Sequence, residues 1–181
     1  FQPEGTGAVT SDYSIQDKLR QIVSVTDFGA TGNGVTNDAP AIQNAINAAE
    51  SAYGGAVYFP PGIYKVTSTF TLGTNNVTLI GAGSDTTHDS GTGDRPATII
   101  NYLGASNTSN YLFNFITPPN VNATTRTGGG MQNIFIQCNP LLAGGLKIIS
   151  RRAAYFKNIC VYNPVYCAYM ISCWKTGVEV P

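Results

Sequence analysis

The sequence contains few charged residues. Asp, Glu, Lys and Arg make up 11% of its 181 residues, well below the share of about a quarter that is usual. Ten acidic residues balance ten basic ones, so the chain lacks the positive charge by which proteins bind nucleic acids. It also lacks an apolar run long enough to cross a membrane. We therefore expect neither binding to nucleic acid nor insertion into a membrane.

Residues that hold metals and cofactors are also scarce. The chain has one histidine and four cysteines, and no two cysteines form a CxxC pair, which argues against a zinc site. The DFG sequence at 27–29 has no other kinase motif beside it. The glycines of 81–83 open no helix, as a dinucleotide site requires. We expect no metal and no cofactor. Four cysteines among apolar residues are expected to be buried free thiols: Cys138, Cys160, Cys167 and Cys173.

Glycine and small polar residues take the place of the charges, as in sheet-rich proteins with many turns. Residues 1–12 are rich in glycine, threonine, proline and serine and are predicted to form a linker. Residues 14–22 predict a short amphipathic helix with Ser14 as its cap. Its apolar stripe needs a partner and consists of Ile15, Leu19 and Ile22. Together these segments form a predicted connector over residues 1–22.

A longer helix is predicted within residues 23–55. An alternating strand over 23–28 and a glycine-rich turn over 29–34 precede it. Asp38 is a candidate cap for this helix, and Pro40 suits its first turn. The glycines at 54 and 55 are expected to stop it. Its buried stripe is predicted to be Ile42, Ala45, Ile46 and Ala49.

After Gly55 the pattern predicts strands only. Short apolar runs separated by turns lie at 56–59, 63–66, 70–72, 76–80, 97–102, 111–116, 132–137, 146–149, 156–162 and 167–172. Residues 132–137 match 157–162 at a spacing of 25, and 145–150 resemble 167–172 at a spacing of 22. A repeat of this length without helices favours a β-solenoid whose coils stack on one another. Alternation within the repeat places Ile134, Ile136, Ile159 and Val161 toward the core.

The N-terminal third also resembles a known family. The matching segments are VTDFGATGNGVTND at 25–38, AIQNAI at 41–46 and GGAVYFPPGIY at 54–64. They are similar to the beginning of pectate-lyase-like parallel β-helix proteins, in which aspartate is usual at the positions of Asn33 and Asn37. GTGAV at 5–9 and QDKLR at 16–20 resemble the connector of phage tailspikes. The resemblance covers about residues 5–83.

This resemblance implies an all-β solenoid, a right-handed single-stranded parallel β-helix with an N-terminal capping α-helix. The helix within 23–55 would cover the open end of the core, where unpaired strand edges otherwise meet water. Residues 56–181 would then form about five coils over about 24 Å. Because no cap is evident after Trp174, we expect these coils to be the N-terminal part of a longer spike.

The implied function is that of a phage tailspike on the virion tail, which recognises and degrades bacterial surface polysaccharide as a hydrolase or lyase. The resemblance further implies a homotrimer that is attached to other tail proteins through its N-terminus. A non-enzymatic β-helix adhesin or structural tail fibre is the alternative. A cellular pectin lyase or polygalacturonase would not need the connector. We expect the full-length protein to be a depolymerase and this chain alone to lack a complete active site.

Candidate site residues come from the residue types that such chemistry uses. Hydrolysis generally needs two carboxylates, and elimination needs a base and a cation. The acids after the predicted helix are Asp85, Asp89, Asp94 and Glu179, which we take as catalytic candidates. Candidate substrate-binding residues are His88, Arg95, Tyr166 and Trp174. The simpler interpretation of 84–96 is a solvated loop between strands, and aromatic residues of a β-helix often pack in its core or between subunits.

Overall fold

The structure, a computed structural model, describes residues 22–52, 54–73, 76–84, 97–116, 128–138, 142–149, 153–162, 166–171 and 177–179. Its elements follow one another as β1 (Ile22–Ser24), η1 (Val25–Phe28), β2 (Asn33–Asn37), α2 (Ala39–Ser51), β3 (Gly54–Phe59), β4 (Gly62–Val66), β5 (Phe70–Leu72), β6 (Asn76–Gly81), β7 (Thr98–Tyr102), β8 (Asn107–Ile116), β9 (Gly130–Cys138), β10 (Leu142–Ile149), β11 (Tyr155–Tyr162), β12 (Tyr166–Ile171) and β13 (Gly177–Glu179). No helix in these ranges is long and apolar enough to span a membrane.

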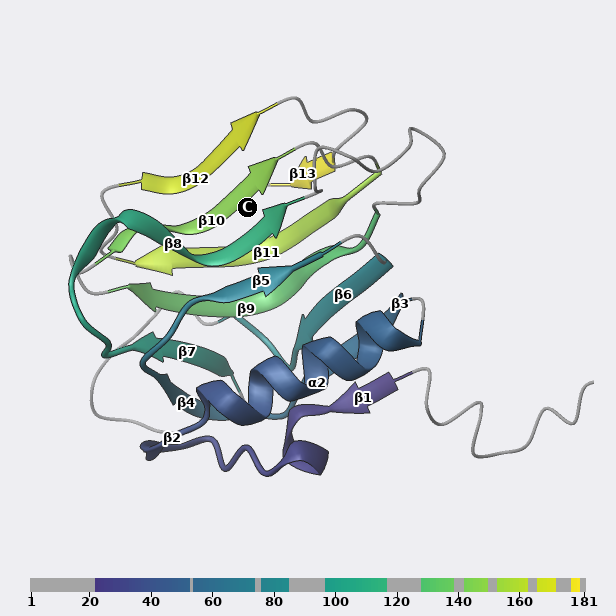
Figure 1. The fold of residues 1–181 in the computed structure, drawn as a ribbon, viewed down its shortest axis with the longest axis vertical. Coiled ribbons are helices and arrows are strands. Elements are labelled where there is room, and N and C mark those ends of the chain that lie inside the picture. Colours follow the sequence, from purple (N-terminus) through teal and green to yellow (C-terminus); the bar gives the residue numbers. More distant parts are fainter. Residues whose placement is uncertain are drawn as a thin grey trace, which may run out of the picture.

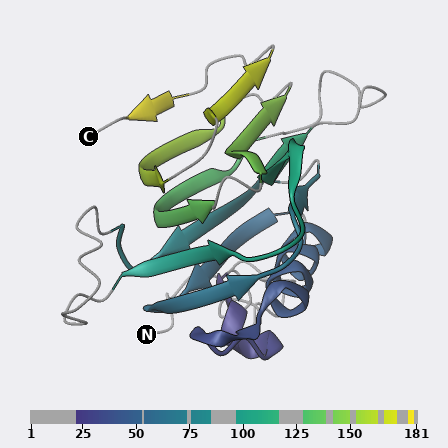
Figure 2. The ribbon, with the colours of Figure 1, turned by 90° about the vertical axis from the view of Figure 1, so that its left-hand side faces the viewer.

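Every strand pairs in parallel with its counterpart in the next coil, and the coils stack into a solenoid (Figures 1 and 2). The first face contains β1, β3, β6, the first halves of β9 and β11, and β13. The second face contains β2, β4, β7 and the second halves of β9 and β11. The third face contains β5, β8, β10 and β12. The predicted β-solenoid is therefore confirmed.

The repeat seen in the sequence corresponds to the strand register. Gln132 pairs with Lys157, a spacing of 25 residues, and Leu146 pairs with Ala168, a spacing of 22. The third coil is much longer, because Thr78 pairs with Gly130, 52 residues later. The extra length falls largely in two segments, 85–96 and 117–127, which lie outside the described residues. The solenoid thus has one coil that carries two long insertions.

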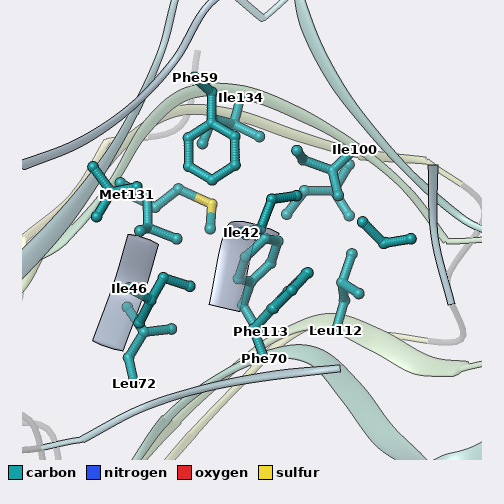
Figure 3. Packing of buried hydrophobic residues seen from close by; sticks show 14 of the residues in the cluster. Ile42, Ile46, Phe59, Phe70, Leu72, Ile100, Leu112, Phe113, Met131 and Ile134 are labelled. Carbon is teal, nitrogen blue, oxygen red and sulfur yellow. The ribbon is translucent and has the colours of Figure 1, made fainter. Parts of the chain in front are cut away.

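Helix α2 covers one end of the core, with β12 near the other end (Figure 1). Ile42 and Ile46 are fully buried and lie close to Phe70 and Leu72 (Figure 3). The four residues predicted as the buried stripe of this helix are all buried. The helix therefore has the capping position that the sequence predicts, and it removes the apolar side chains of the first coils from water.

The aromatic residues of the third face extend the core beyond the helix. The rings of Phe70 and Phe113 stack with their centroids 4.9 Å apart, and Phe115 meets Phe156 edge to face at 5.1 Å. Ile134 and Ile136 are fully buried, and the core also packs against Ile159 and Val161, as predicted. Stacked rows of this kind bury apolar surface continuously from one coil to the next.

Local structure before the helix differs from the prediction. The strand expected over 23–28 ends at Ser24, because Ser24 and Asp27 form a capping box that opens the 3-10 helix η1. Ile22 begins β1 and pairs with Ala56, so it does not end a helix. The rest of the helix predicted over 14–22 lies outside the described residues. Strand β13 is an element that the sequence did not predict.

The ends of α2 also differ in detail. Asp38 makes no side-chain bond to the helix; its carboxylate accepts hydrogen bonds from the backbone N–H of Thr31 (2.8 Å), the Thr31 hydroxyl (3.1 Å) and the backbone N–H of Gly32 (3.0 Å). At 1% exposure, Asp38 fixes the preceding turn instead. The helix ends at Ser51, before the glycines expected to stop it, and these two glycines begin β3.

Candidate functional site

The first and second faces meet at a tight corner that is marked by two asparagines. Asn133 and Asn158 have positive φ values of 57° and 49°, a conformation that asparagine tolerates better than most residues. This one residue turns each of β9 and β11 from the first face to the second without interrupting the strand. We call this edge of the solenoid the asparagine corner.

An open cleft of about 410 Å³ lies at this corner, and we call it the corner cleft. Three successive coils contribute to it. Its lining residues are Ala82, Gly83 and Ser84 of the third coil, Asn133 of the fourth, and Asn158, Ile159 and Cys160 of the fifth. The lining therefore combines two carboxamides and a hydroxyl with a small apolar wall.

The two carboxamides are paired along the solenoid axis. The Asn158 Nδ2 donates to the Asn133 Oδ1 at 3.0 Å. A carboxamide has two N–H donors and a carbonyl acceptor, so the pair brings groups of both kinds to the wall of the cleft. Groups of both kinds, held on a stiff backbone, suit a ligand that carries hydroxyl groups.

Thr98 fixes the third coil at the cleft. Its buried hydroxyl donates to the carbonyl of Phe59 at 2.9 Å and accepts from the N–H of Ala82 at 2.9 Å. The N–H of Thr98 donates to the carbonyl of Gly83 at 2.9 Å. The residues that flank the insertion 85–96 are thus hydrogen-bonded to each other, and Ala82, Gly83 and Ser84 on its N-terminal side line the cleft.

Six of the candidate residues lie outside the described residues. Asp85, His88, Asp89, Asp94 and Arg95 belong to the insertion 85–96, and Trp174 lies between β12 and β13. The insertion begins directly after Ser84 and returns to the fold at Ala97. The insertion thus starts directly after a residue that lines the corner cleft.

The other two candidates lie on different faces. Tyr166 pairs with Gly144 on the third face, and Gly144 also pairs with Tyr111, which is buried. Glu179 pairs with Lys157 on the first face, and Lys157 pairs with Gln132. The sequence suggested no partner for Glu179, whereas the register sets it beside a lysine.

The other carboxylates in the described ranges have structural roles. Asp27 accepts from the N–H of Ser24 at 3.1 Å, Asp38 holds the turn at 31–32, and Glu50 accepts a hydrogen bond from the N–H of Gly73. None of the three lines the corner cleft. Within the same ranges, no group of three His, Cys, Asp or Glu residues could hold a metal ion.

The two described thiols differ in their surroundings. Cys138 is buried as predicted, and burial raises the pKa of its thiol to about 12. Cys160 is partly exposed because it lines the cleft, which differs from the prediction of a buried thiol. Sequence reasoning missed Cys160, Asn133 and Asn158 as site residues. The signal was present, since both asparagines occupy the same place in the 25-residue repeat.

A family model described as rhamnogalacturonase A/epimerase, pectate lyase-like, matches residues 22–163. The chain belongs to this family. The resemblance that the sequence suggested is therefore confirmed. The right-handed parallel β-helix with one capping helix is the fold expected of a pectate-lyase-like chain, and it agrees with the face and register pattern described above.

Individual relatives of this pectate-lyase-like chain include an epimerase and a phage protein. Mannuronan C5-epimerase AlgE6 of Azotobacter vinelandii is 51% identical over 67 residues, which cover 33% of this chain and 8% of the epimerase. The solved A-module of that epimerase has a TM-score of 0.62 at 26% identity, covering 85% of this chain and 41% of the module. ORF18 of Geobacillus virus E2 has a TM-score of 0.62 at 31% identity, covering 80% of this chain and 26% of that protein. This chain thus spans less than half of each relative.

Proposed function

We propose that this chain belongs to a phage tailspike that recognises and degrades bacterial surface polysaccharide, and that the corner cleft is part of its sugar-binding site. One structural observation carries the proposal: the insertion with three aspartates, a histidine and an arginine follows directly on residues 82–84, which line a cleft with two carboxamides and are hydrogen-bonded to Thr98 just after the insertion. The similarity to a phage protein and to a mannuronan epimerase supports it.

The residues of the insertion have the chemistry that a depolymerase needs. Two carboxylates on either side of a glycosidic bond would support hydrolysis, and Asp85, Asp89 and Asp94 supply the candidates, with Glu179 on the first face as a fourth. For elimination, a base removes a proton beside a uronate carboxylate while a cation stabilises the developing charge. His88 and Arg95 suit these two roles. Tyr166 and Trp174 remain candidates for contacts with sugar rings.

The tailspike proposal also includes the assembly of the protein. We propose a homotrimer on the virion tail, with residues 1–22 as the connector toward other tail proteins, 23–55 as the capping segment and 56–181 as the coils. In a trimer, the apolar residue Ile22, which is 63% exposed, would be covered by a neighbouring subunit.

A non-enzymatic adhesin is the second candidate. The observation that favours it is that Asp27, Asp38 and Glu50 are all engaged in hydrogen bonds that hold the fold. A pair of catalytic carboxylates therefore has to come from the insertion, from Glu179 or from other parts of the full-length protein. A spike without such a pair would bind polysaccharide without cutting it.

Degradation of the host polymer separates the two candidates. The full-length protein is incubated with purified host capsule or O-antigen, and viscosity, reducing ends and the absorbance of unsaturated uronates are followed. We expect the viscosity to fall and new chain ends to appear, and at least one of the variants Asp85→Asn, Asp89→Asn and Asp94→Asn to lose activity roughly a hundredfold. Asp12→Asn, in the connector, is the matched control and keeps full activity.

Two other results carry distinct meanings. If the polymer is bound but remains intact, the protein is an adhesin and the depolymerase is rejected. If neither capsule nor O-antigen of the host binds to the protein, a polysaccharide-directed function is rejected altogether.

A further inference from the structure

Strand β2 contains the chain's only Asn–Gly step, formed by Asn33 and Gly34. Asn33 is exposed, and Gly34 has a φ of 75°, in the left-handed region that glycine adopts most easily. An asparagine carboxamide can react with the backbone nitrogen of the next residue, and glycine obstructs this reaction least because it has no side chain. Whether the step reacts in the folded protein depends on how the fold holds the Asn33 carboxamide.

The Asn33 carboxamide is hydrogen-bonded at both of its polar atoms to the residues that follow it. Its Oδ1 accepts from the backbone N–H of Val35 at 2.9 Å and from the backbone N–H of Thr36 at 2.9 Å. The bond to Val35 closes a ring that includes the Gly34 nitrogen, so the carboxamide folds back along the peptide bond with which it would react. The Asn33 Nδ2 donates to the Thr36 hydroxyl at 3.0 Å.

These contacts supply what deamidation of an asparagine needs. When the Gly34 nitrogen attacks Cγ of Asn33, negative charge develops on Oδ1, and the two N–H donors already bonded to that oxygen stabilise the charge. The leaving nitrogen is Nδ2, which must gain a proton, and the Thr36 hydroxyl is within hydrogen-bonding distance of it. The nucleophile, the donors for the developing charge and the proton donor therefore come from consecutive residues.

Strand β2 is also weakly held by the sheet (Figure 1). Among the described strands it is the last of the second face and pairs with β4 alone. The pairing of Asn33 with Ile63 turns the Gly34 N–H toward β4, but the register shifts before the next pair, at Asn37. Short edge strands open locally at little cost in free energy, and the bonds of the Asn33 carboxamide do not involve β4. Local opening therefore frees the Gly34 nitrogen while the carboxamide stays in place.

We propose that Asn33 is a self-modification site, at which the folded protein converts asparagine to aspartate. The Gly34 nitrogen bonds to Cγ of Asn33 and loses its proton to hydroxide from the solvent. The Cγ–Nδ2 bond breaks, and Nδ2 takes up a proton and leaves as ammonia. Water then opens the resulting succinimide ring at either of its two carbonyl carbons, which gives aspartate or isoaspartate. The net reaction consumes one water and releases one ammonia.

The two products affect this end of the solenoid in opposite ways. An aspartate carboxylate accepts from the same N–H groups of Val35 and Thr36, and its charge strengthens both hydrogen bonds. Isoaspartate lengthens the backbone of β2 by one carbon, which disturbs the pairing with β4 and the neighbouring turn that Asp38 holds. Ageing therefore divides the protein into a form with a firmer first coil and a form with a weaker one.

Ageing of the intact protein at mildly alkaline pH tests the proposal. Deamidation is followed by peptide mass spectrometry, and isoaspartate by enzymatic methylation, in the native state and in concentrated urea. Thr36→Val removes the hydroxyl beside the leaving group, and Thr36→Ser restores it. Thr71→Val is the matched control, because Thr71 is likewise exposed but lies on β5 of the third face. Asn33→Gln, whose longer side chain disfavours the ring, and Asn33→Asp complete the set.

We expect native Asn33 to deamidate at least about tenfold faster than any other asparagine of the chain, and within about tenfold of its own rate in urea. Thr36→Val should slow the native reaction at least about tenfold and leave the rate in urea unchanged. Thr36→Ser and Thr71→Val should keep the original native rate. The original protein should lose thermal stability with age, whereas Asn33→Gln keeps its initial value and fresh Asn33→Asp is at least as stable as the fresh original.

Three results would overturn the proposal, and none of them bears on the polysaccharide-directed function. If Asn33 stays intact in the native state while the urea-unfolded chain deamidates there, the fold protects the step. If Thr36→Val and Thr71→Val react at the same native rate, the Thr36 hydroxyl takes no part and the assigned chemistry is rejected. If another asparagine reacts faster than Asn33, the self-modification site lies elsewhere. Thermal unfolding of each fresh variant verifies that the compared proteins are folded.

Discussion

Asn133 and Asn158 occupy the same corner of two successive coils and are joined by a hydrogen bond of 3.0 Å from Nδ2 of Asn158 to Oδ1 of Asn133. The bond lies at the point where the chain turns from the first face to the second. It therefore links the geometry of the fold to the wall of the corner cleft. A change at either asparagine is expected to affect both the stability of the solenoid and the shape of the cleft.

Two substitutions of Asn158 separate the cost of its positive φ from the cost of losing its side-chain hydrogen bond. Asn158→Ala places a β-carbon with no local hydrogen bond at a φ of 49° and should lower the free energy of unfolding by about 1–2 kcal/mol. Asn158→Gly loses the same hydrogen bond without the strain and should cost about 0.5–1 kcal/mol. Urea denaturation of both variants measures the difference. Equal losses would show that the positive φ carries no cost.

Asp38 is expected to be among the most sensitive polar residues of the fold. Asp38→Ala leaves the N–H groups of Thr31 and Gly32 without their acceptor and should destabilise the protein by about 3 kcal/mol. Asp27→Ala, which removes an exposed capping bond, should cost only about 1 kcal/mol. Thermal and urea unfolding of the two variants give the comparison. Similar losses for both would contradict the role assigned to the buried carboxylate.

The raised pKa of Tyr64 predicts how the stability of the protein changes at alkaline pH. Burial, followed by the charges of Asp38 and Tyr58, raises the pKa of Tyr64 from 10.0 to about 12. A raised pKa means that the folded state keeps its proton after the unfolded chain has lost it. The contribution of this pKa difference to the free energy of unfolding is complete below pH 10 and is lost as the pH rises toward 12.

The corresponding measurement is urea denaturation at several pH values between 9 and 12, for the original protein and for Tyr64→Phe. The variant also loses the hydrogen bond from the Tyr64 hydroxyl to the carbonyl of Pro60 (2.9 Å), so its stability is lower at neutral pH. The gap between the two proteins should narrow as the pH rises. A gap that stays constant over this range would show that Tyr64 titrates alike in both states.

Most of the fold could be predicted because apolar alternation and repeat spacing are local signals. Gln132 and Lys157, paired in the sequence repeat, are neighbours in the structure, and the apolar stripe of α2 is buried as expected. The 3-10 helix after Ser24 was missed because a capping box and the start of a strand use similar residues. Phe135 is buried although alternation places it outward, so alternation alone does not predict burial at this position.

The candidate site was less predictable. The sequence identified the acidic insertion, yet the residues that surround its base come from three coils whose register depends on loop lengths. The 52-residue spacing between Thr78 and Gly130 cannot be derived from a repeat of 22 to 25. For the same reason, the alignment of Lys65 with Asn101 and Gln137 appears only once the coils are stacked.

Protection of Cys160 is the most direct test of the central claim that polysaccharide occupies the corner cleft. In a Cys167→Ser, Cys173→Ser variant, Cys160 is the accessible thiol of the two that remain, because Cys138 is buried with its pKa raised to about 12. The rate of its alkylation by iodoacetamide is measured with and without host polysaccharide. We expect saturating polymer to slow this alkylation at least about fivefold. An unchanged rate, under conditions where binding of the polymer is independently verified, would contradict the account.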